Sequence, residues 1–202
     1  VFSSSSSVYG DVENFPTTED EPTSPKSPYA LQKLVIEEYC KLYSELYNLD
    51  TVSLRYFNVY GPNQHADNAY ATVICAWIKG YIKDKPIRLD GTGEQSRDFS
   101  YVDDVCQANY VVGINENNFN GEIFNVAQND NTNLNQIMEM IKNLSNNNPK
   151  IIRKDFRIGD VFKTHASIDK IKRLKFKPQV PINKGIQLTY NWYDSFLNKK
   201  IK

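Results

Sequence analysis

The chain has 202 residues, of which 40% are hydrophobic, and its 24 basic and 24 acidic side chains balance to a net charge of zero. This length and composition are typical of a globular chain with one large domain or two small ones. Because there is no overall positive charge, a nucleic acid is not an expected partner. No apolar run is long enough to span a bilayer, so a membrane partner is not expected either.

The chain carries three cysteines, Cys40, Cys75 and Cys106, which are widely spaced and form no C-x-x-C pattern. This arrangement favours neither a disulfide framework nor a zinc site, and no metal is expected. A reducing compartment suits three free thiols, so we expect a cytoplasmic protein.

The first half of the chain begins with a strand-like segment and continues into a long helix. Residues 1–2, followed by small residues, predict the end of a buried strand that opens into a loop at the edge of a sheet. Residues 11–28 are rich in Pro, Thr, Ser and acidic side chains and predict a loop. A helix is expected over 28–47, where apolar residues recur at helical spacing. Its aromatic side chains, including Tyr39 and Tyr43, are expected to contact the core or a second subunit.

Beyond this helix, strands and helices alternate, which implies a parallel sheet. Residues 51–60 predict one strand, ended by the Gly61-Pro62 pair. The remaining predictions, in chain order, are a helix at 69–83, a strand at 87–89, a turn at 90–93, a helix at 102–115, a strand at 123–126, a helix from Asn133 to about 144, a strand near 151, a loop at 155–161, a short helix at 169–174 and a last helix at 182–197.

The most informative pair of residues is Tyr29 and Lys33, which lie four positions apart and therefore on one face of the predicted helix. An ammonium group beside a phenol favours the phenolate and makes the tyrosine a usable base. A hydroxyl from the serine run at 3–7 could hydrogen-bond the same substrate oxygen. The spacing Y-x-x-x-K alone is common in helices, so its context decides whether it is a catalytic motif.

That context is a set of five segments which together resemble the extended short-chain dehydrogenase/reductase family of nucleotide-sugar epimerases and dehydratases. The segments are residues 4–10, 27–33, 54–62, 96–105 and 157–161. Within the family, Gln64, residues 68–71, residues 107–109 and residues 154–161 are most similar to the UDP-N-acetylglucosamine 4-epimerases.

The resemblance implies an α/β fold with the second half of a Rossmann-type parallel sheet and a smaller α/β nucleotide-sugar-binding domain. Residues 1–62 would form the C-terminal part of the NAD-binding domain, with the catalytic serine and Tyr/Lys motifs. Residues 63–202 would be mainly the UDP-sugar domain, with some elements returning to the Rossmann sheet.

The resemblance also implies NAD as cofactor and inversion at C4 of a UDP-sugar through a 4-keto intermediate. Tyr29 would take the proton of the C4 hydroxyl, and Lys33 would hold the ribose next to the nicotinamide. Ser5, Ser6 or Ser7 would hydrogen-bond the C4 oxygen, with Ser5 as the first choice and Ser6 as the next. Further cofactor contacts are implied for Ser4, Phe57, Tyr29 and Lys33.

For the nucleotide half of the substrate, the resemblance points to Arg97 and Arg157, whose guanidinium groups match phosphate oxygens in a bidentate way. Asp160 would accept a hydrogen bond from a ribose hydroxyl. Arg97 could instead form a structural ion pair with its neighbour Asp98. The other implied substrate contacts are Ser5, Ser6, Ser7, Tyr29, Asn58, Gln64, Ala71, Thr72 and Thr164, together with Ile87 and Leu89 as the lining of the base pocket.

The sequence departs from the family in two respects. It has Asn131 where the similar epimerases tend to carry an arginine, and it contains no G-x-x-G-x-x-G turn for the NAD pyrophosphate. The family places this turn before the serine run, so we expect that the chain is a fragment whose sheet exposes an unpaired edge. Alternatives to the epimerase are a UDP-glucuronate 4-epimerase, a dehydratase or reductase of the same family, and a non-catalytic nucleotide-sugar-binding protein. Dehydratases carry Thr-Asp-Glu where this chain has Ser5-Ser6-Ser7. A homodimer is the expected assembly.

Overall fold

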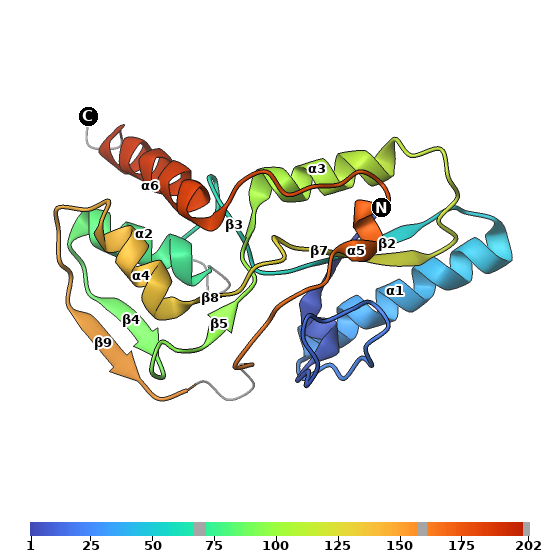
Figure 1. Cartoon of the computed structure of the whole chain (residues 1–202), viewed down its shortest axis with the longest axis horizontal. Helices are drawn as coiled ribbons and strands as arrows, with labels where there is room; N and C mark the ends of the chain where they lie inside the picture. The colour runs from blue at the N-terminus through green and yellow to red at the C-terminus, as the bar shows by residue number, and fades with distance from the viewer. Residues whose placement is uncertain (67–71, 157–160, 200–202) are drawn as a thin grey trace.

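The structure is a computed structural model of the chain, and it describes residues 1–66, 72–156 and 161–199 (Figure 1). Three of the predicted substrate residues, Ala71, Arg157 and Asp160, lie outside the described residues.

A three-stranded parallel sheet forms the centre of one of the two parts of the molecule, around the first hydrophobic core. Its strands are β1 (Phe2–Ser5), β2 (Val52–Tyr56) and β7 (Glu122–Val126), in the order β1-β2-β7. The parallel α/β architecture expected from the sequence is therefore confirmed. In the described part of the chain β1 pairs only with β2, so it is the edge strand of this sheet.

The serine run begins inside the sheet, because β1 extends through Ser5 instead of ending after Phe2. A 3-10 turn, η1 (Ser6–Tyr9), follows directly, and it ends at Gly10, which has a φ of 68°. The run is thus divided between a strand and a turn, which fixes the direction of each hydroxyl.

Two long helices lie on opposite sides of the sheet in Figure 1, with α3 (Val102–Gly113) above the strands and α1 (Pro28–Tyr47) below them. Side chains alternate along β2, so its two faces differ in character. Leu54 packs with Ala108 and Val112 of α3, whereas Arg55 bonds to Glu37 of α1. The α3 side of the sheet is therefore apolar, and the α1 side carries a buried charge.

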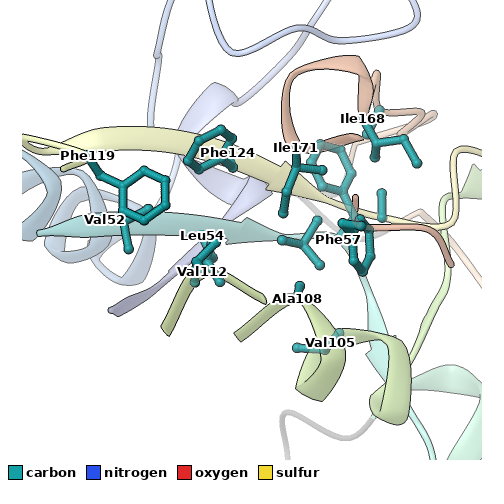
Figure 2. Close-up of a cluster of buried hydrophobic side chains, with 14 of the residues drawn as sticks. Val52, Leu54, Phe57, Val105, Ala108, Val112, Phe119, Phe124, Ile168 and Ile171 are labelled. Carbon is teal, nitrogen blue, oxygen red and sulfur yellow. The ribbon is translucent and has the colours of Figure 1, made fainter. Parts of the chain in front are cut away.

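The first hydrophobic core fills the space around β2 and β7, and most of its side chains appear in Figure 2. It draws residues from distant parts of the chain, including α5 (Asp169–Lys172) near the C-terminal end. Its labelled members are Val52, Leu54, Phe57, Val105, Ala108, Val112, Phe119, Phe124, Ile168 and Ile171. Burial of these side chains holds the central sheet together.

A second core joins three helices to a separate two-stranded sheet. The helices are α2 (Val73–Lys83), α4 (Leu134–Lys142) and α6 (Ile182–Lys199), and the strands are β4 (Ile87–Asp90) and β9 (Ile151–Lys154), which pair in parallel. Two short pairs complete the fold: β3 (Val59–Tyr60) with β6 (Ser100–Tyr101) in parallel, and β5 (Ser96–Arg97) with β8 (Thr132–Asn133) antiparallel. No described helix is both long and apolar enough to cross a membrane.

The chain between 51 and 60 forms two strands, so the prediction of a single strand is wrong. β2 ends at Tyr56 and β3 begins at Val59, because Asn58 between them has a φ of 30°, which no strand residue adopts. The predicted helix at 69–83 begins at Val73 in the described part, since Thr72 has an extended backbone. The predicted positions 69–71 lie outside the described residues.

The apolar side chains of α1 are mostly exposed, so the expectation that they contact the core of this chain is wrong. Tyr39 is 55% exposed and Tyr43 is 46% exposed, whereas Ala30 and Glu37 are buried and Leu34 packs partly against the first core. The exposed face consists of Leu31, Val35, Ile36, Tyr39, Leu42, Tyr43, Leu46 and Tyr47. Contact with a second subunit remains a prediction for this α1 face.

Candidate active site

A cavity of about 440 Å³ opens where β1 and β2 end, beside the first turn of α1. Ligands of parallel α/β folds bind at this end of the strands. The cavity brings together many of the residues singled out in the sequence, which come from distant parts of the chain. Those lining it are Ser4, Ser5, Ser6, Ser7, Tyr29, Asn58, Gln64, Thr72, Arg97 and Thr164.

The hydroxyl of Ser5 is oriented by the turn that follows it. Ser5 is the N-cap of η1, and its Oγ accepts hydrogen bonds from Ser7 N at 3.2 Å and from Ser7 Oγ at 3.0 Å. Since both of these bonds are accepted, the proton of Ser5 is left to donate toward the cavity. Ser5 therefore has the geometry of a donor to a substrate oxygen.

Tyr29 lies in the first turn of α1, and its side chain is 49% exposed on the cavity wall. The helix begins here because Ser27 Oγ accepts a hydrogen bond from Ala30 N at 3.1 Å, with Pro28 at the first helical position. This cap fixes the direction in which Tyr29 leaves the helix.

Lys33 lies one turn after Tyr29, and its Nζ is 5.7 Å from the centroid of the Tyr29 ring. The same ammonium group donates to the carbonyl of Ser3 at 2.7 Å and lies 5.1 Å from the centroid of the Phe2 ring. Lys33 is not among the residues that line the cavity. It is held between α1 and the backbone of β1, directly behind the tyrosine.

Other residues that line the cavity are held in place by hydrogen bonds between distant loops. Asn58 Nδ2 donates to Thr164 Oγ1 at 3.1 Å and to the carbonyl of Asp98 at 3.2 Å. Thr164 Oγ1 also accepts from Asp98 N at 3.1 Å. Gln64 and Thr72 form a second pair, in which Thr72 Oγ1 donates to Gln64 Oε1 at 2.6 Å.

Arg97 and Asp98 are neighbours in sequence, but their side chains have different surroundings. Arg97 lines the cavity, and its Nη1 donates to the carbonyls of Ser96 at 2.8 Å and Phe162 at 3.1 Å. Asp98 is fully buried, and its carboxyl accepts from Gln128 N at 3.0 Å and Ala166 N at 3.1 Å. Burial raises the pKa of Asp98 to about 7. Asp98 thus joins two loops through hydrogen bonds, whereas Arg97 lines the cavity.

Three residues implied by the resemblance are placed in the cores instead of on the cavity. Ile87 and Leu89 are 3% and 1% exposed and belong to the second core, because alternation along β4 turns both toward the same buried face. They are not among the residues that line the described cavity, and their role at a base pocket stays a prediction. Phe57 is 2% exposed in the first core.

The cavity also contains side chains that sequence reasoning missed, among them Lys26, Tyr56 and Val59. Tyr56 OH donates to Asn109 Oδ1 at 3.0 Å and lies 3.2 Å from Ser3 Oγ. Each of these three residues is one or two positions away from a motif residue in the sequence. This proximity to a motif is the signal by which sequence reasoning could have found them.

The residues of the site fit one end of a dinucleotide. Lys33 carries three donors, and within the described residues one of them bonds to the carbonyl of Ser3, so it can also bind hydroxyl groups of a ribose. Tyr29 and Ser5 both line the cavity. The pyrophosphate end has no counterpart in the sequence, which lacks the Gly-rich turn.

Comparisons with known proteins place the chain in a family. Residues 1–127 match the model of the NAD dependent epimerase/dehydratase family. A putative UDP-glucose 4-epimerase of Methanocaldococcus jannaschii is 36% identical over 190 residues, which cover 94% of this chain and 61% of that protein. A UDP-glucuronate 4-epimerase of Thermodesulfobacterium geofontis is 35% identical, over 95% of this chain and 58% of that protein.

A solved structure with a similar fold is the UDP-N-acetylglucosamine 4-epimerase of Methanobrevibacter ruminantium in complex with UDP-N-acetylmuramic acid. The TM-score is 0.89 at 37% identity, over 96% of this chain and 62% of that one. The chain thus spans about 60% of the length of the relatives that it matches. By its match to the family model over more than half of its residues, the chain belongs to the NAD dependent epimerase/dehydratase family.

Proposed function

We propose that the protein containing this chain is an NAD-dependent epimerase that inverts C4 of a UDP-sugar. The observation that carries the proposal is the cavity lined by Tyr29, Ser5, Asn58 and Arg97. It combines an acid–base group and a hydroxyl donor with polar groups suited to a nucleotide-sugar. Family membership and the 4-epimerases among the relatives support the same reaction.

The proposed roles follow from the hydrogen bonds of each side chain. Ser5 donates its proton to the C4 oxygen of the sugar, because its lone pairs already accept from Ser7. Tyr29 takes and returns the proton of the C4 hydroxyl, and the ammonium group of Lys33 lies 5.7 Å from the centroid of its ring. Bound NAD would supply the oxidation and the reduction at C4. Lys33, Tyr29 and Ser4 would hold its nicotinamide ribose end, with Phe57 behind them.

We propose a UDP-N-acetylhexosamine as the preferred substrate, with a UDP-hexose or UDP-glucuronate as the alternatives. Gln64 and Thr72 form a hydrogen-bonded pair on the cavity wall, and an amide and a hydroxyl are suitable partners for an acetamido group. Arg97 would bind the diphosphate. Arg157 and Asp160 keep their proposed roles at the diphosphate and the ribose.

The remaining proposals concern the organisation of the protein. We propose residues 1–62 as part of the cofactor domain and residues 63–202 as mainly the substrate domain. The three free cysteines support a cytoplasmic location. We also propose a homodimer that forms through the exposed α1 face.

The proposal is tested by the substitution Tyr29→Phe in the protein that contains this chain. Loss of the proton-transfer group should lower kcat by about 10²- to 10⁴-fold, while binding of UDP stays unchanged. Interconversion of UDP-GlcNAc and UDP-GalNAc is measured by chromatography, with UDP-glucose and UDP-glucuronate as the other substrates. The matched control is Tyr110→Phe, an exposed tyrosine of α3 outside the cavity.

If the wild type converts none of these UDP-sugars, the epimerase proposal fails. If it binds UDP without converting it, the non-catalytic nucleotide-sugar-binding reading takes its place. Equal loss of binding and turnover in Tyr29→Phe would assign the tyrosine a structural role.

A further inference from the structure

A buried ion pair lies between α1 and the central sheet, just behind the serine run. The side chains of Glu37 and Arg55 are 0% and 3% exposed. Arg55 Nε donates to Glu37 Oε1 at 3.0 Å, and Arg55 Nη2 donates to Glu37 Oε2 at 2.7 Å. This is the bidentate geometry, which fixes both the distance and the angle between the two groups.

The pair reaches both the strand and the turn that carry the serine run. Ser4 Oγ donates to Glu37 Oε1, so the end of β1 is tied to α1. The guanidinium carbon of Arg55 lies 4.6 Å from the centroid of the Tyr9 ring, which closes η1. Tyr9 OH in turn donates to Asn125 Oδ1 at 2.7 Å. The ion pair therefore touches the segments on either side of Ser5 and Ser6.

The same pair is linked to the catalytic face of α1. Glu37 lies one turn after Lys33 and two turns after Tyr29, so the three side chains leave the helix on one face. Lys33 bonds to the backbone of Ser3, and Glu37 bonds to the side chain of Ser4. Lys33 and Glu37 lie on neighbouring turns of that face, and they thus hold Ser3 and Ser4, which are adjacent in β1.

A buried ion pair is an unusual way to stabilise a fold. Removing two charges from water costs several kcal/mol per ion, and apolar side chains of similar volume often stabilise a core as well. A bidentate pair differs from apolar packing in that it specifies one orientation. This difference favours a role in geometry for Glu37 and Arg55.

We propose that Glu37 and Arg55 are positioning residues that hold the serine run at the distance from Tyr29 which proton transfer at C4 requires. The inference rests on the proposed epimerase function. It also assigns a specific role to Ser4, whose proton is used toward Glu37, so that it can only accept hydrogen bonds from a ligand in the cavity. Ser4 and Ser5, at adjacent positions of β1, thereby offer an acceptor and a donor to the cavity.

The first test is Glu37→Gln, which keeps the shape of the side chain but removes its charge and one acceptor. Asp104→Asn is the matched control, because Asp104 is also a buried carboxylate that accepts from two groups, Gln179 N and Val180 N, away from the cavity. We expect kcat to fall by about 10²-fold in Glu37→Gln, with little change in KM for the UDP-sugar. Asp104→Asn should leave both constants unchanged at temperatures where it is folded.

The second test is the double substitution Glu37→Met with Arg55→Met, which removes both buried charges and is expected to fold. If the pair has a positioning role, this variant should have a melting temperature near that of the wild type, and its kcat should fall by as much as the kcat of Glu37→Gln. If the double variant folds and keeps wild-type kcat, the ion pair has no positioning role and the inference is overturned.

A third measurement separates this inference from the proposed function. Amide hydrogen exchange of residues 3–9 should become faster in Glu37→Gln and stay unchanged in Asp104→Asn. If the wild type proves inactive on every UDP-sugar, the proposed function fails, and this exchange still shows whether the pair holds the serine run. Unchanged exchange in Glu37→Gln would overturn the inference whatever the activity.

Discussion

Two neighbouring serines of this chain have opposite hydrogen-bonding roles, although they are chemically identical. Ser4 is 3% exposed and donates to Glu37 below the sheet. Ser5 is more exposed and accepts from Ser7 in the turn above the strand end. The difference arises because successive side chains of a strand point to opposite faces. Position along β1 therefore decides which hydroxyl can donate to a substrate.

Asp98 is a second residue whose surroundings change its chemistry. Its pKa is raised from 3.8 to about 7 because the carboxyl is fully buried between two loops. The folded protein therefore binds a proton at Asp98 between these pH values, where the unfolded chain does not. The stabilisation that comes from this proton on Asp98 is fully present below pH 4 and is lost as the pH rises through 7.

The prediction is tested by Asp98→Asn, with the free energy of unfolding measured in urea from pH 4 to pH 8. The rise of the Asp98 pKa from 3.8 to about 7 corresponds to roughly 4 kcal/mol. Between pH 4 and pH 8 the free energy of unfolding of the wild type should therefore fall by that much more than the free energy of unfolding of the variant. Asp98→Ala should behave as the Asn variant does, since neither titrates. A difference between wild type and variants that stays constant with pH would contradict the prediction.

At the scale of elements, the helices of this chain begin and end where local hydrogen bonds dictate. α1 begins after the Ser27 cap and ends at Asn48, whose φ of 54° is left-handed. α4 begins with a complete capping box, in which Asn133 accepts from Gln136 N at 2.8 Å and Gln136 accepts from Asn133 N at 2.9 Å. Such ends are encoded by two or three adjacent residues.

We predict that Asn133→Ala lowers the free energy of unfolding by about 1 kcal/mol, because the substitution leaves the amide of Gln136 without its acceptor. Urea denaturation at neutral pH measures the change. Asn143→Ala at the other end of α4 is the control and should cost about 0.5 kcal/mol or less. Equal effects of the two substitutions would show that the capping box contributes nothing specific.

At the scale of the whole molecule, the exposed α1 face is an apolar feature left outside both cores. Its aromatic pair, Tyr43 and Tyr47, has ring centroids 5.1 Å apart, and Tyr39 precedes Tyr43 by one turn. A contiguous apolar surface of this kind is typical of an interaction site. The proposed homodimer would bury it against the same face of a second copy.

The dimer is tested by the double substitution Tyr39→Lys with Tyr43→Lys, which places two charges on neighbouring turns of the α1 face. The proposed dimer should become a monomer in sedimentation equilibrium, because an uncompensated charge buried in an interface is strongly unfavourable. Tyr110→Lys on α3 is the control. A wild type that is already monomeric at the same concentration would exclude this assembly.

The sequence alone predicted most of the elements, because their signals are local. Ser27, Pro28 and Asn48 bound α1, and the alternation of strands with helices implied the parallel sheet that β1, β2 and β7 form. The break at Asn58 was missed, since an apolar run of strand-forming residues conceals a single left-handed position. For the apolar side chains of α1 the sequence left contact with the core and contact with a second subunit open, because an apolar stripe does not say whether its own chain or another molecule covers it.

The sequence by itself singled out many of the side chains that line the candidate site, through its serine run, its Tyr29 and Lys33 pair and its resemblance to a family. Only the tertiary structure decided how they are arranged. It brought Arg97 and Thr164 to the same cavity as Ser5 and placed Ile87 and Leu89 in a core. It also joined Glu37 to Arg55. These contacts join residues far apart in the chain, and packing between elements fixes them, whereas propensities and caps act only over a few neighbouring residues.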